Sequence, residues 1–330
     1  MIPYKFKDWV DQSKLDKSGL SINYNAVYYL DNHRDEIDYQ LIVANDNAYL
    51  LLNDLIKENL IDVNSSSISN HADIELLYKN NSNINLDYFW LSSNYNAKNL
   101  LKNNYNDLNY SEVCGNVNAM EIIENMSPDK IDYTELSRNY NAIDMLEMNK
   151  SKINWDVLST NPGATKLLAE NPDKINFGNL SCNYNIDDKC LRDIILDNLD
   201  ELDWSEVSAN AGAFYILMEN FDRICWDSLC ENLNEKCLDL LKIYPEKIEW
   251  NILSTNPNAS KFFENNLSKV NWFYLSANHS IFELDYLKMR EKIMPIRFDL
   301  LKVRWLITIE NMSDPYIIAD DIINQIISYL

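Results

Sequence analysis

The stretch from Ile153 to Leu168, INWDVLSTNPGATKLL, decides how this 330-residue chain folds. It returns as IEWNILSTNPNA from Ile248 and, with more changes, as IDYTELSRNYNA from Ile131. Taking the leading aliphatic residue as position zero, we place twelve units, most of them 22–24 residues apart. They begin at Leu15, Ile37, Ile61, Leu86, Leu108, Ile131, Ile153, Ile175, Leu202, Ile224, Ile248 and Val270. The chain is therefore built from tandem repeats.

Each unit carries the signals of two short helices. Position +1 is usually Asp or Asn, whose side chain accepts hydrogen bonds from the free N–H groups at a helix start. An aromatic residue at +2 and an aliphatic one at +5 lie on one face of that helix, and Ser at +6 leaves room for close packing. Asn at +8 predicts the cap of a second helix, whose buried stripe is Ala at +11 and apolar residues at +14 and +15. An Asn near the end of that helix predicts a left-handed turn.

The Asn at +8 is the most regular feature of the repeat. The Asn residues at this position are Asn23, Asn45, Asn94, Asn116, Asn139, Asn161, Asn183, Asn210, Asn232, Asn256 and Asn278. The third unit, from Ile61, is Ser-rich and fits the pattern only with a one-residue slip. We interpret the column as N-caps, with a ligand-binding ladder as the alternative.

Such units must stack on one another, because one unit alone cannot bury its own apolar face. The sequence therefore predicts an all-α fold: an α-solenoid, wound as a right-handed superhelix, of about twelve two-helix repeats with terminal caps. Neighbouring helices pack about 8–10 Å apart, so twelve units would follow a path of roughly 100–120 Å. We assign residues 1–14 to an N-terminal cap, 15–285 to the solenoid and 286–330 to a C-terminal helical cap.

The motif Ile-Asp/Asn-Trp-x-x-Leu-Ser-x-Asn-Pro/Tyr-x-Ala-x-x-Leu-Leu is clearest in residues 131–170 and 202–266. It resembles a tandem-repeat family of giant amoebal DNA viruses, the mimivirus group, and the richness in Asn, Ile and Tyr fits the AT-rich genomes of those viruses. The resemblance implies a viral protein and no enzyme activity. In layout the repeat is also similar to the leucine-rich-repeat-variant solenoid, a likeness that assigns no functional residue.

Charge and hydropathy exclude several classes of protein. The 29 basic and 51 acidic residues give a formal net charge of −22, which argues against binding to DNA or RNA because phosphate contacts need a basic surface. The sequence contains no apolar run of about 18 residues, the length that a membrane-spanning helix needs. The start MIPYKFKD lacks an apolar signal region. We expect a protein that is not secreted, located in the host cytoplasm or the virion if it is viral, with its 6 Cys as reduced thiols.

No catalytic constellation emerges from the sequence. It has no Gly-rich phosphate loop, no nucleophile elbow and no paired His on a helix. His33, His71 and His279 lie in units one, three and twelve, too far apart in a solenoid to share a metal. No Cys-x-x-Cys pair marks a zinc site, and Cys114 and Cys230 replace the Ser at +6, which indicates small buried residues. We expect no enzyme activity, no cofactor and no metal; a metal or redox role of the cysteines is the alternative.

Binding residues are expected at variable, exposed positions. Positions +3 and +4 vary along the chain, and two units are aromatic at both, with Phe89 and Trp90 in one and Phe273 and Tyr274 in the other. Aromatic side chains in an exposed groove are typical interface anchors, so these four are the candidate partner-binding residues. The alternative is that they fill irregular packing, above all beside the degenerate third unit. The aromatic column at +2 is interpreted as core, and a binding groove there is its alternative.

The last 45 residues reverse the local charge, with six Lys and Arg residues between positions 288 and 304. We expect a capping helix whose basic groups, with Arg297, Lys302 and Arg304 as candidate contacts, meet the acidic solenoid. A partner-docking tail and an amphipathic membrane-surface helix are the alternatives.

The sequence thus predicts a non-enzymatic, protein-binding scaffold with an extended acidic surface, which favours basic partners. We expect a monomer or weak self-association. The alternative function is a structural component of a giant-virus particle or viral factory.

Overall fold

The computed structural model describes residues 1–63 and 66–292. The described residues form two compact units, Phe6–Phe282 and a smaller one made of Met1–Lys5 with residues 283–292. The predicted all-α class is confirmed, because the described residues form mainly short α- and 3-10 helices and only two three-residue strands. Among these residues, we find no helix with the length and apolar character needed to cross a membrane.

The helices of Phe6–Phe282 follow one another in pairs. The first helices of the pairs are α1 (Lys17–Ile22), η3 (Ile42–Ala44), α4 (Ser66–Ser69), α6 (Tyr88–Ser93), α8 (Tyr110–Gly115), α10 (Tyr133–Arg138), α12 (Trp155–Ser159), α14 (Phe177–Leu180), α16 (Trp204–Ala209), α18 (Trp226–Leu229), α20 (Trp250–Leu253) and α22 (Trp272–Ala277). The second helices are α2 (Val27–Asn32), α3 (Tyr49–Lys57), α5 (Ile74–Asn80), α7 (Lys98–Asn103), α9 (Met120–Ile123), α11 (Ile143–Glu147), α13 (Thr165–Ala169), α15 (Arg192–Asp197), α17 (Phe214–Glu219), α19 (Glu235–Ile243) and α21 (Ser260–Phe263).

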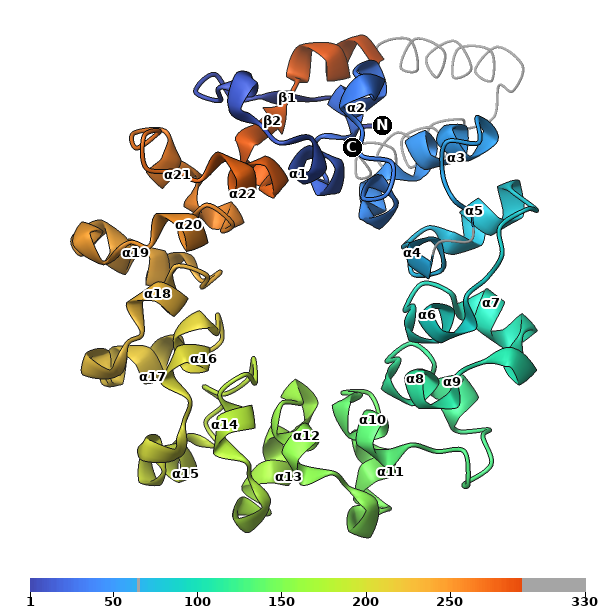
Figure 1. The fold of residues 1–330 in the computed structure, drawn as a ribbon. Coiled ribbons are helices and arrows are strands. Elements are labelled where there is room, and N and C mark those ends of the chain that lie inside the picture. The colour runs from blue at the N-terminus through green and yellow to red at the C-terminus, as the bar shows by residue number, and fades with distance from the viewer. Residues whose placement is uncertain (64–65, 293–330) are drawn as a thin grey trace, which may run out of the picture. The chain divides into compact units, whose positions relative to one another are not determined.

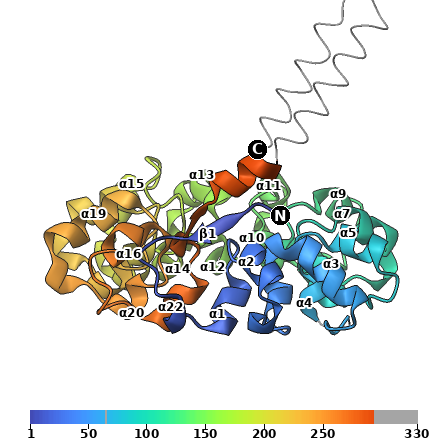
Figure 2. The same cartoon turned by 90° about the horizontal axis from the view of Figure 1, so that it is seen from above.

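These pairs are arranged in a ring (Figure 1). The first helices lie on the inner side and the second helices on the outer side. Seen from the edge, α1, α4, α20 and α22 lie towards one rim and α7, α9, α13 and α15 towards the other (Figure 2). The apolar core follows the ring between the two sets, because the aliphatic residues at +5 and at +15 are buried throughout, as in Leu158 and Leu168.

The caps that start the first helices are those that the sequence predicts. At α10, Asp132 Oδ1 accepts from the backbone N–H groups of Thr134 and Glu135, at 2.9 and 3.3 Å. Such bonds satisfy donors that a helix start leaves without an intrahelical partner. At α18 the residue at +1 is Cys225, and no side-chain cap forms there.

The Asn at +8 joins neighbouring units as well as capping. Asn116 Oδ1 accepts from the N–H of Asn118 at 3.0 Å, which stabilises the turn that leads into α9. Its Nδ2 donates to the carbonyls of Ser92 and Asn94 in the preceding unit, at 3.0 and 3.1 Å. The predicted N-cap role is confirmed at Asn45, Asn161, Asn256 and Asn278, which cap short 3-10 helices. It is wrong for second α-helices such as α9, which begin after the Ala at +11. The bonds between units are an addition. The side chain is buried, so both of its ends must be satisfied within the protein.

Ser at +6 forms a second column of bonds between units. The Ser137 hydroxyl donates to the carbonyl of Tyr133 at 2.6 Å within its own helix. It accepts from the N–H of Asn154, the +1 residue of the next unit, at 3.1 Å. The hydroxyl is thus a specific link as well as a small side chain.

The third unit is shifted further than the sequence predicts. His71 takes the place of the Asn at +8, because its Nε2 bonds the carbonyl of Asn45 at 3.2 Å and its own carbonyl accepts from Asn94 at 3.0 Å. The +8 positions Asn45 and His71 are 26 residues apart. The slip relative to Ile61 is therefore two residues rather than one, and Ser66 and Ser67 occupy +3 and +4. The extra length lies in the nine-residue α3 and the turn at Asn59, which has a left-handed φ of 58°.

The first and last helices pack against each other. Asn23 Nδ2 donates to the carbonyls of Ser276 and Asn278, at 2.9 and 3.0 Å. The N–H of Asp16 donates to Ser276 Oγ at 2.7 Å, and Lys14 Nζ lies 5.2 Å from the centre of the Trp272 ring. Each of these contacts repeats one made inside the ring. The α1–α22 contact is therefore one more interface of the same kind.

This closure differs from the predicted solenoid, whose two ends we expected to be covered by separate terminal caps. Unequal surfaces that pack head to tail give a ring when the rotations between them add up to one turn, and an open helix when they do not. In Phe6–Phe282 the first unit thus covers the last.

The N-terminal segment packs on the last helices of the ring. The N–H of Lys7 donates to the carbonyl of Ile281 at 2.9 Å, and the rings of Trp9 and Phe263 lie 6.3 Å apart. Strand β1 (Tyr4–Phe6) pairs with β2 (Phe282–Leu284).

The smaller unit is held by local contacts. Lys5 pairs with Glu283 at 2.8 Å, and the N–H of Asp285 donates to the carbonyl of Pro3 at 2.9 Å. Most of the predicted C-terminal cap, with Arg297, Lys302 and Arg304, lies outside the described residues.

The Asn residues near the ends of the second helices do not adopt the left-handed turn that we predicted. Asn149, Asn171 and Asn220 have φ values of −127°, −135° and −129°. Their side chains instead donate to the carbonyl four residues earlier, as Asn171 does to Leu167 at 2.8 Å. That bond satisfies a carbonyl that the helix end leaves without a partner.

Candidate binding surface

The side chains at +3 and +4 of successive units form a continuous surface, which we call the first-helix face. Asn179 Nδ2 at +4 donates to the carbonyl of Asp156 at +3 of the preceding unit, at 2.9 Å. The hydroxyls of Ser205 and Ser228, at +3 and +4 of their units, lie 2.8 Å apart. A partner that lies on one unit can therefore extend onto the next.

The four aromatic residues predicted to bind a partner lie on this face and are exposed. The exposed fractions are 45% for Phe89, 42% for Trp90, 60% for Phe273 and 44% for Tyr274. In each pair the two rings meet edge to face, with centres 5.5 Å apart. These residues are not needed to fill the core, although their binding role stays a prediction. The two pairs lie on separate helices, α6 and α22 (Figure 1).

Acidic residues occupy the same face on α8 to α18, between the two aromatic pairs. They are Glu112, Glu135, Asp156, Glu206 and Asp227. Within the described part of the chain, one ion pair involves this set, between Arg138 and Glu135 at 3.3 Å. Burial raises the pKa of the Glu112 carboxyl, and the nearby negative charge of Glu135 raises it further. The face therefore holds like charges close together, which a cation would relieve.

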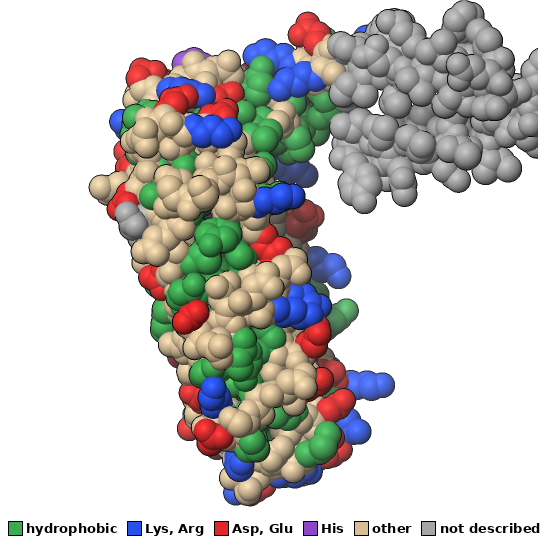
Figure 3. Space-filling view, turned by 90° about the vertical axis from the view of Figure 1, so that its right-hand side faces the viewer, with side chains coloured by type: hydrophobic (Ala, Val, Ile, Leu, Met, Phe, Trp, Pro, Cys, Tyr) green, Lys and Arg blue, Asp and Glu red, His purple; other side chains and the backbone are tan. Residues whose placement is uncertain are grey.

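The outer side of the ring has a different charge pattern. Lys and Arg side chains alternate with Asp and Glu and with hydrophobic patches over the side seen in Figure 3. Many of these charges are paired across neighbouring units, such as Lys102 with Glu121 at 2.7 Å and Arg34 with Glu58 at 2.8 Å. On the first-helix face from α8 to α18, only Glu135 of the five acidic residues has a basic partner among the described residues.

A hollow of about 220 Å³ lies on this face beside Trp90. It is lined by Val43, Ala44, Asp46, Ser66, Ser67, Asn70, His71 and Trp90. The lining comes from the second, third and fourth units, so the shifted third unit lies at its centre. The small Ser66 and Ser67 leave space where unit eleven has the bulkier Asn251 and Ile252.

His71 is a buried residue at the base of this hollow. Its side chain is neutral. Its Nδ1 accepts from the N–H of Asp73 at 2.9 Å, so the proton is on Nε2, which donates to the carbonyl of Asn45. Burial lowers the pKa of the imidazole, against the opposing effects of Asn45, Asp46 and Asp73. His71 therefore adds no positive charge to the hollow near neutral pH.

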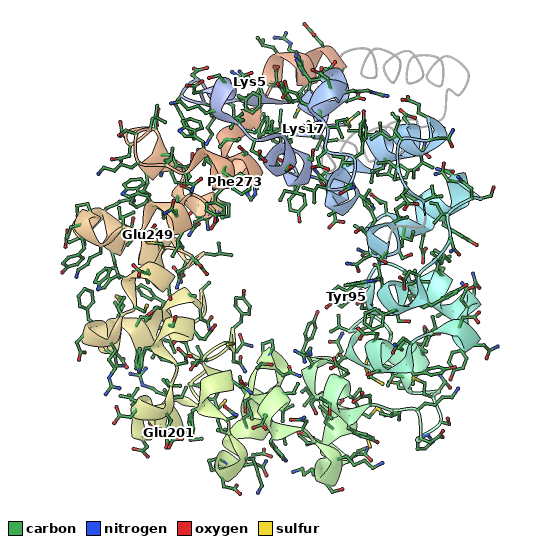
Figure 4. All side chains as sticks on the ribbon, in the orientation of Figure 1. Lys5, Lys17, Tyr95, Glu201, Glu249 and Phe273 are labelled. Atoms are coloured by element: carbon green, nitrogen blue, oxygen red, sulfur yellow. The ribbon has the colours of Figure 1, made fainter. Side chains whose placement is uncertain are left out.

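Sequence reasoning identified Trp90 and the irregular third unit separately but missed the hollow that they form together. A signal was present, because the step of 26 residues to His71 places two Ser residues at +3 and +4. It also missed the tyrosines that follow the Asn column at +9. Tyr24, Tyr95, Tyr140 and Tyr184 are exposed, and Tyr95 lies at the inner edge of the ring (Figure 4).

The aromatic residues at +2 do not form a binding groove. Trp155, Trp204, Trp226, Trp250 and Trp272 are all half-buried and none is exposed. Several are covered by the cation that precedes the next unit, such as Trp250 by Lys269 at 5.2 Å and Trp204 by Arg223 at 5.4 Å. The core interpretation is therefore right for the packed side of these rings, and in Trp204, Trp250 and Trp272 a Lys or Arg lies over the ring.

The described residues contain no group of three or more His, Cys, Asp or Glu side chains that could hold a metal ion. Cys114, Cys230 and Cys237 are buried, and burial raises the pKa of each thiol. The burial expected of Cys114 and Cys230 is thus confirmed. Comparisons with protein-family models, with curated proteins and with solved structures found no match.

Proposed function

We propose that this chain is a closed array of twelve two-helix repeats that acts as a non-enzymatic scaffold and binds a basic polypeptide segment along its first-helix face. The observation that carries the proposal is the composition of that face. Its acidic residues on α8 to α18 have a single basic partner among the described residues, and exposed aromatic pairs lie on both sides of them. Exposed aromatic side chains supply contact area, and the uncompensated charge speeds and directs the approach of a basic partner.

The ring shape supports the same proposal. Loss of one unit would open the interface between α1 and α22, so every unit contributes to a surface without ends. Backbone polar groups between units are already bonded by the Asn and Ser columns, as at Asn116 and Ser137. The exposed side chains are therefore what remains for recognition.

The viral assignment is a second part of the proposal. It rests on the likeness of the repeat motif to the giant-virus family. On this proposal the protein acts in the host cytoplasm or in the virion. Mass spectrometry of purified particles separates the scaffold from the structural alternative, because a structural component would be present at high copy number.

A labelled nona-arginine peptide, with nona-glutamate as the comparison, tests the binding proposal on the full chain. We expect nona-arginine to bind and nona-glutamate not to bind. The double variant Glu112→Gln, Asp227→Asn should weaken binding by at least fivefold. The control variant Glu246→Gln, Asp144→Asn also removes two negative charges, but from exposed positions elsewhere on the ring.

The comparison between the two double variants decides the result. If both weaken binding equally, net charge rather than the first-helix face is responsible, and the proposed surface is wrong. If nona-arginine does not bind at 50 mM salt, where surface electrostatics is weakly screened, the proposed basic partner is wrong.

A further inference from the structure

We propose that the hollow beside Trp90 binds one cationic side chain, an arginine or lysine of the partner, with its charge between the Trp90 ring and the Asp46 carboxylate. This inference deepens the proposed function, since the cation would belong to the basic segment. It rests on observations of its own, namely the chemistry of the walls, the exposure of Trp90 and the origin of the space.

The walls of the hollow suit a cation. Asp46 is the one charged group among the lining residues when His71 is neutral, and no Lys or Arg is among them. Asp46 Oδ1 accepts from the N–H of Ala72 at 3.1 Å, which holds the carboxylate in place. Asp46 is exposed, and within residues 1–63 and 66–292 no cation pairs with it.

Trp90 supplies the second half of a cation site. An indole face attracts Lys and Arg through its quadrupole more strongly than Tyr or Phe does. Phe89 meets the Trp90 ring edge to face, with centres 5.5 Å apart, which fixes the orientation of the indole. Val43 and Ala44 add apolar surface for the methylene groups that lead to the charge.

Other tryptophans in the ring already carry such a cation. Lys269 lies over Trp250 and Arg223 over Trp204, at 5.2 and 5.4 Å. In the part of the chain that the structure describes, no Lys or Arg lies over Trp90. Trp155 and Trp226 also have no such cation among the described residues, but they are half-buried, whereas Trp90 is exposed and therefore accessible to a cation from outside.

The space has room for the charged group. In proteins a cavity of about 150 Å³ holds benzene, which is larger than a guanidinium group, and this hollow has about 220 Å³. The corresponding position on α22 is Tyr274, and there Asn251 and Ile252 replace Ser66 and Ser67. Tyr274 is therefore a matched aromatic residue whose neighbours occupy the space.

Nα-acetyl-arginine amide, titrated into the full chain, is the probe. The assay follows the indole N–H signal of Trp90 by NMR, assigned by its loss in Trp90→Leu. Nα-acetyl-citrulline amide, which has nearly the same shape and no charge, is the neutral comparison. We expect saturable shifts with the arginine amide only.

Four variants locate the site. Asp46→Asn should weaken binding at least fivefold, and Ser67→Ile, which places the bulk of Ile252 at an exposed position, should abolish it. Tyr215→Leu and Asp144→Asn, at exposed aromatic and acidic positions outside the first-helix face, are the controls and should bind like the wild type. Melting temperatures of all variants show that the ring remains folded.

Three outcomes would overturn the inference: equal shifts with citrulline amide, unchanged affinity in Ser67→Ile, or equal losses in Asp46→Asn and Asp144→Asn. The proposed function is tested separately. If nona-arginine binds Ser67→Ile as well as it binds the wild type, the hollow is not used and the scaffold proposal stands. If the arginine amide binds and nona-arginine does not, the hollow stands and the scaffold proposal fails.

Discussion

Replacing Gly19 by Leu should open the contact between α1 and α22. A Cβ atom at Gly19 would lie 2.6 Å from Ser276 Cβ and 3.1 Å from the backbone nitrogen of Ala277. Carbon atoms pack at about 3.5–4.0 Å, so the two helices must separate by about 1 Å even for a methyl group. A leucine side chain requires more.

The expected loss follows from the bonds that span this contact. They join Asp16 to Ser276 at 2.7 Å and Asn23 to Ser276 and Asn278 at 2.9 and 3.0 Å. A further 1 Å takes all three beyond hydrogen-bonding distance. At about 0.5–1.5 kcal/mol each the loss is about 1.5–4.5 kcal/mol. The better helix propensity of Leu returns about 1 kcal/mol, so we expect a net destabilisation of about 0.5–3.5 kcal/mol.

Urea unfolding measures that change, and small-angle scattering and hydrogen exchange report on closure. We expect a larger radius of gyration for Gly19→Leu and faster exchange of the Asp16 amide. Gly178→Leu is the control, because a Cβ there meets only Asn176 Oδ1, at 3.5 Å. It should be neutral or stabilising. If Gly19→Leu matches Gly178→Leu in stability, scattering and exchange, the close α1–α22 contact does not exist in solution and the closed ring is wrong.

Four further changes test the links between units. Asn161→Ala should cost more than the 0.5–2 kcal/mol of a cap alone, because the side chain also donates to the carbonyl of Ser137 at 2.8 Å; urea unfolding checks this, and a cost below 0.5 kcal/mol would contradict it. Cys230→Ser should be neutral or stabilising and Cys230→Val should cost about 1–3 kcal/mol, since the sulfur bonds the Glu249 amide and the Trp226 carbonyl; equal stabilities would refute that role. His71 has a lowered pKa in the fold, so the unfolded chain takes up a proton first and stability falls as the pH drops below about 6.5; His71→Asn should lose this part of the pH dependence in thermal melts, and an unchanged pH profile would show that His71 is not its source. Trp204→Ala should cost about 1–3 kcal/mol, less than a fully buried aromatic, because the ring is half-buried; a loss of 5 kcal/mol would show that the exposed side also carries stability.

The candidate site shows where sequence reasoning ends. Phe89 and Trp90 stand out in the sequence because they interrupt a polar pattern at +3 and +4. Their exposure follows from that position in a regular first helix. The hollow does not follow, because it depends on which residues of three units meet, and the register of the third unit is visible only in the bond of His71 to Asn45.

The sequence by itself determined the helix pairs and the all-α class, because caps, apolar spacing and the Asn at +8 act within a few residues. It also determined the excess of negative charge. We propose that this charge attracts a basic partner. The tertiary structure decided that Phe6–Phe282 closes. Closure depends on a small rotation at every interface, and the sum of many small rotations is not encoded at any one position. Gly19 illustrates this, since in the sequence it is a glycine in a helix and in the structure it is where the first helix meets the last.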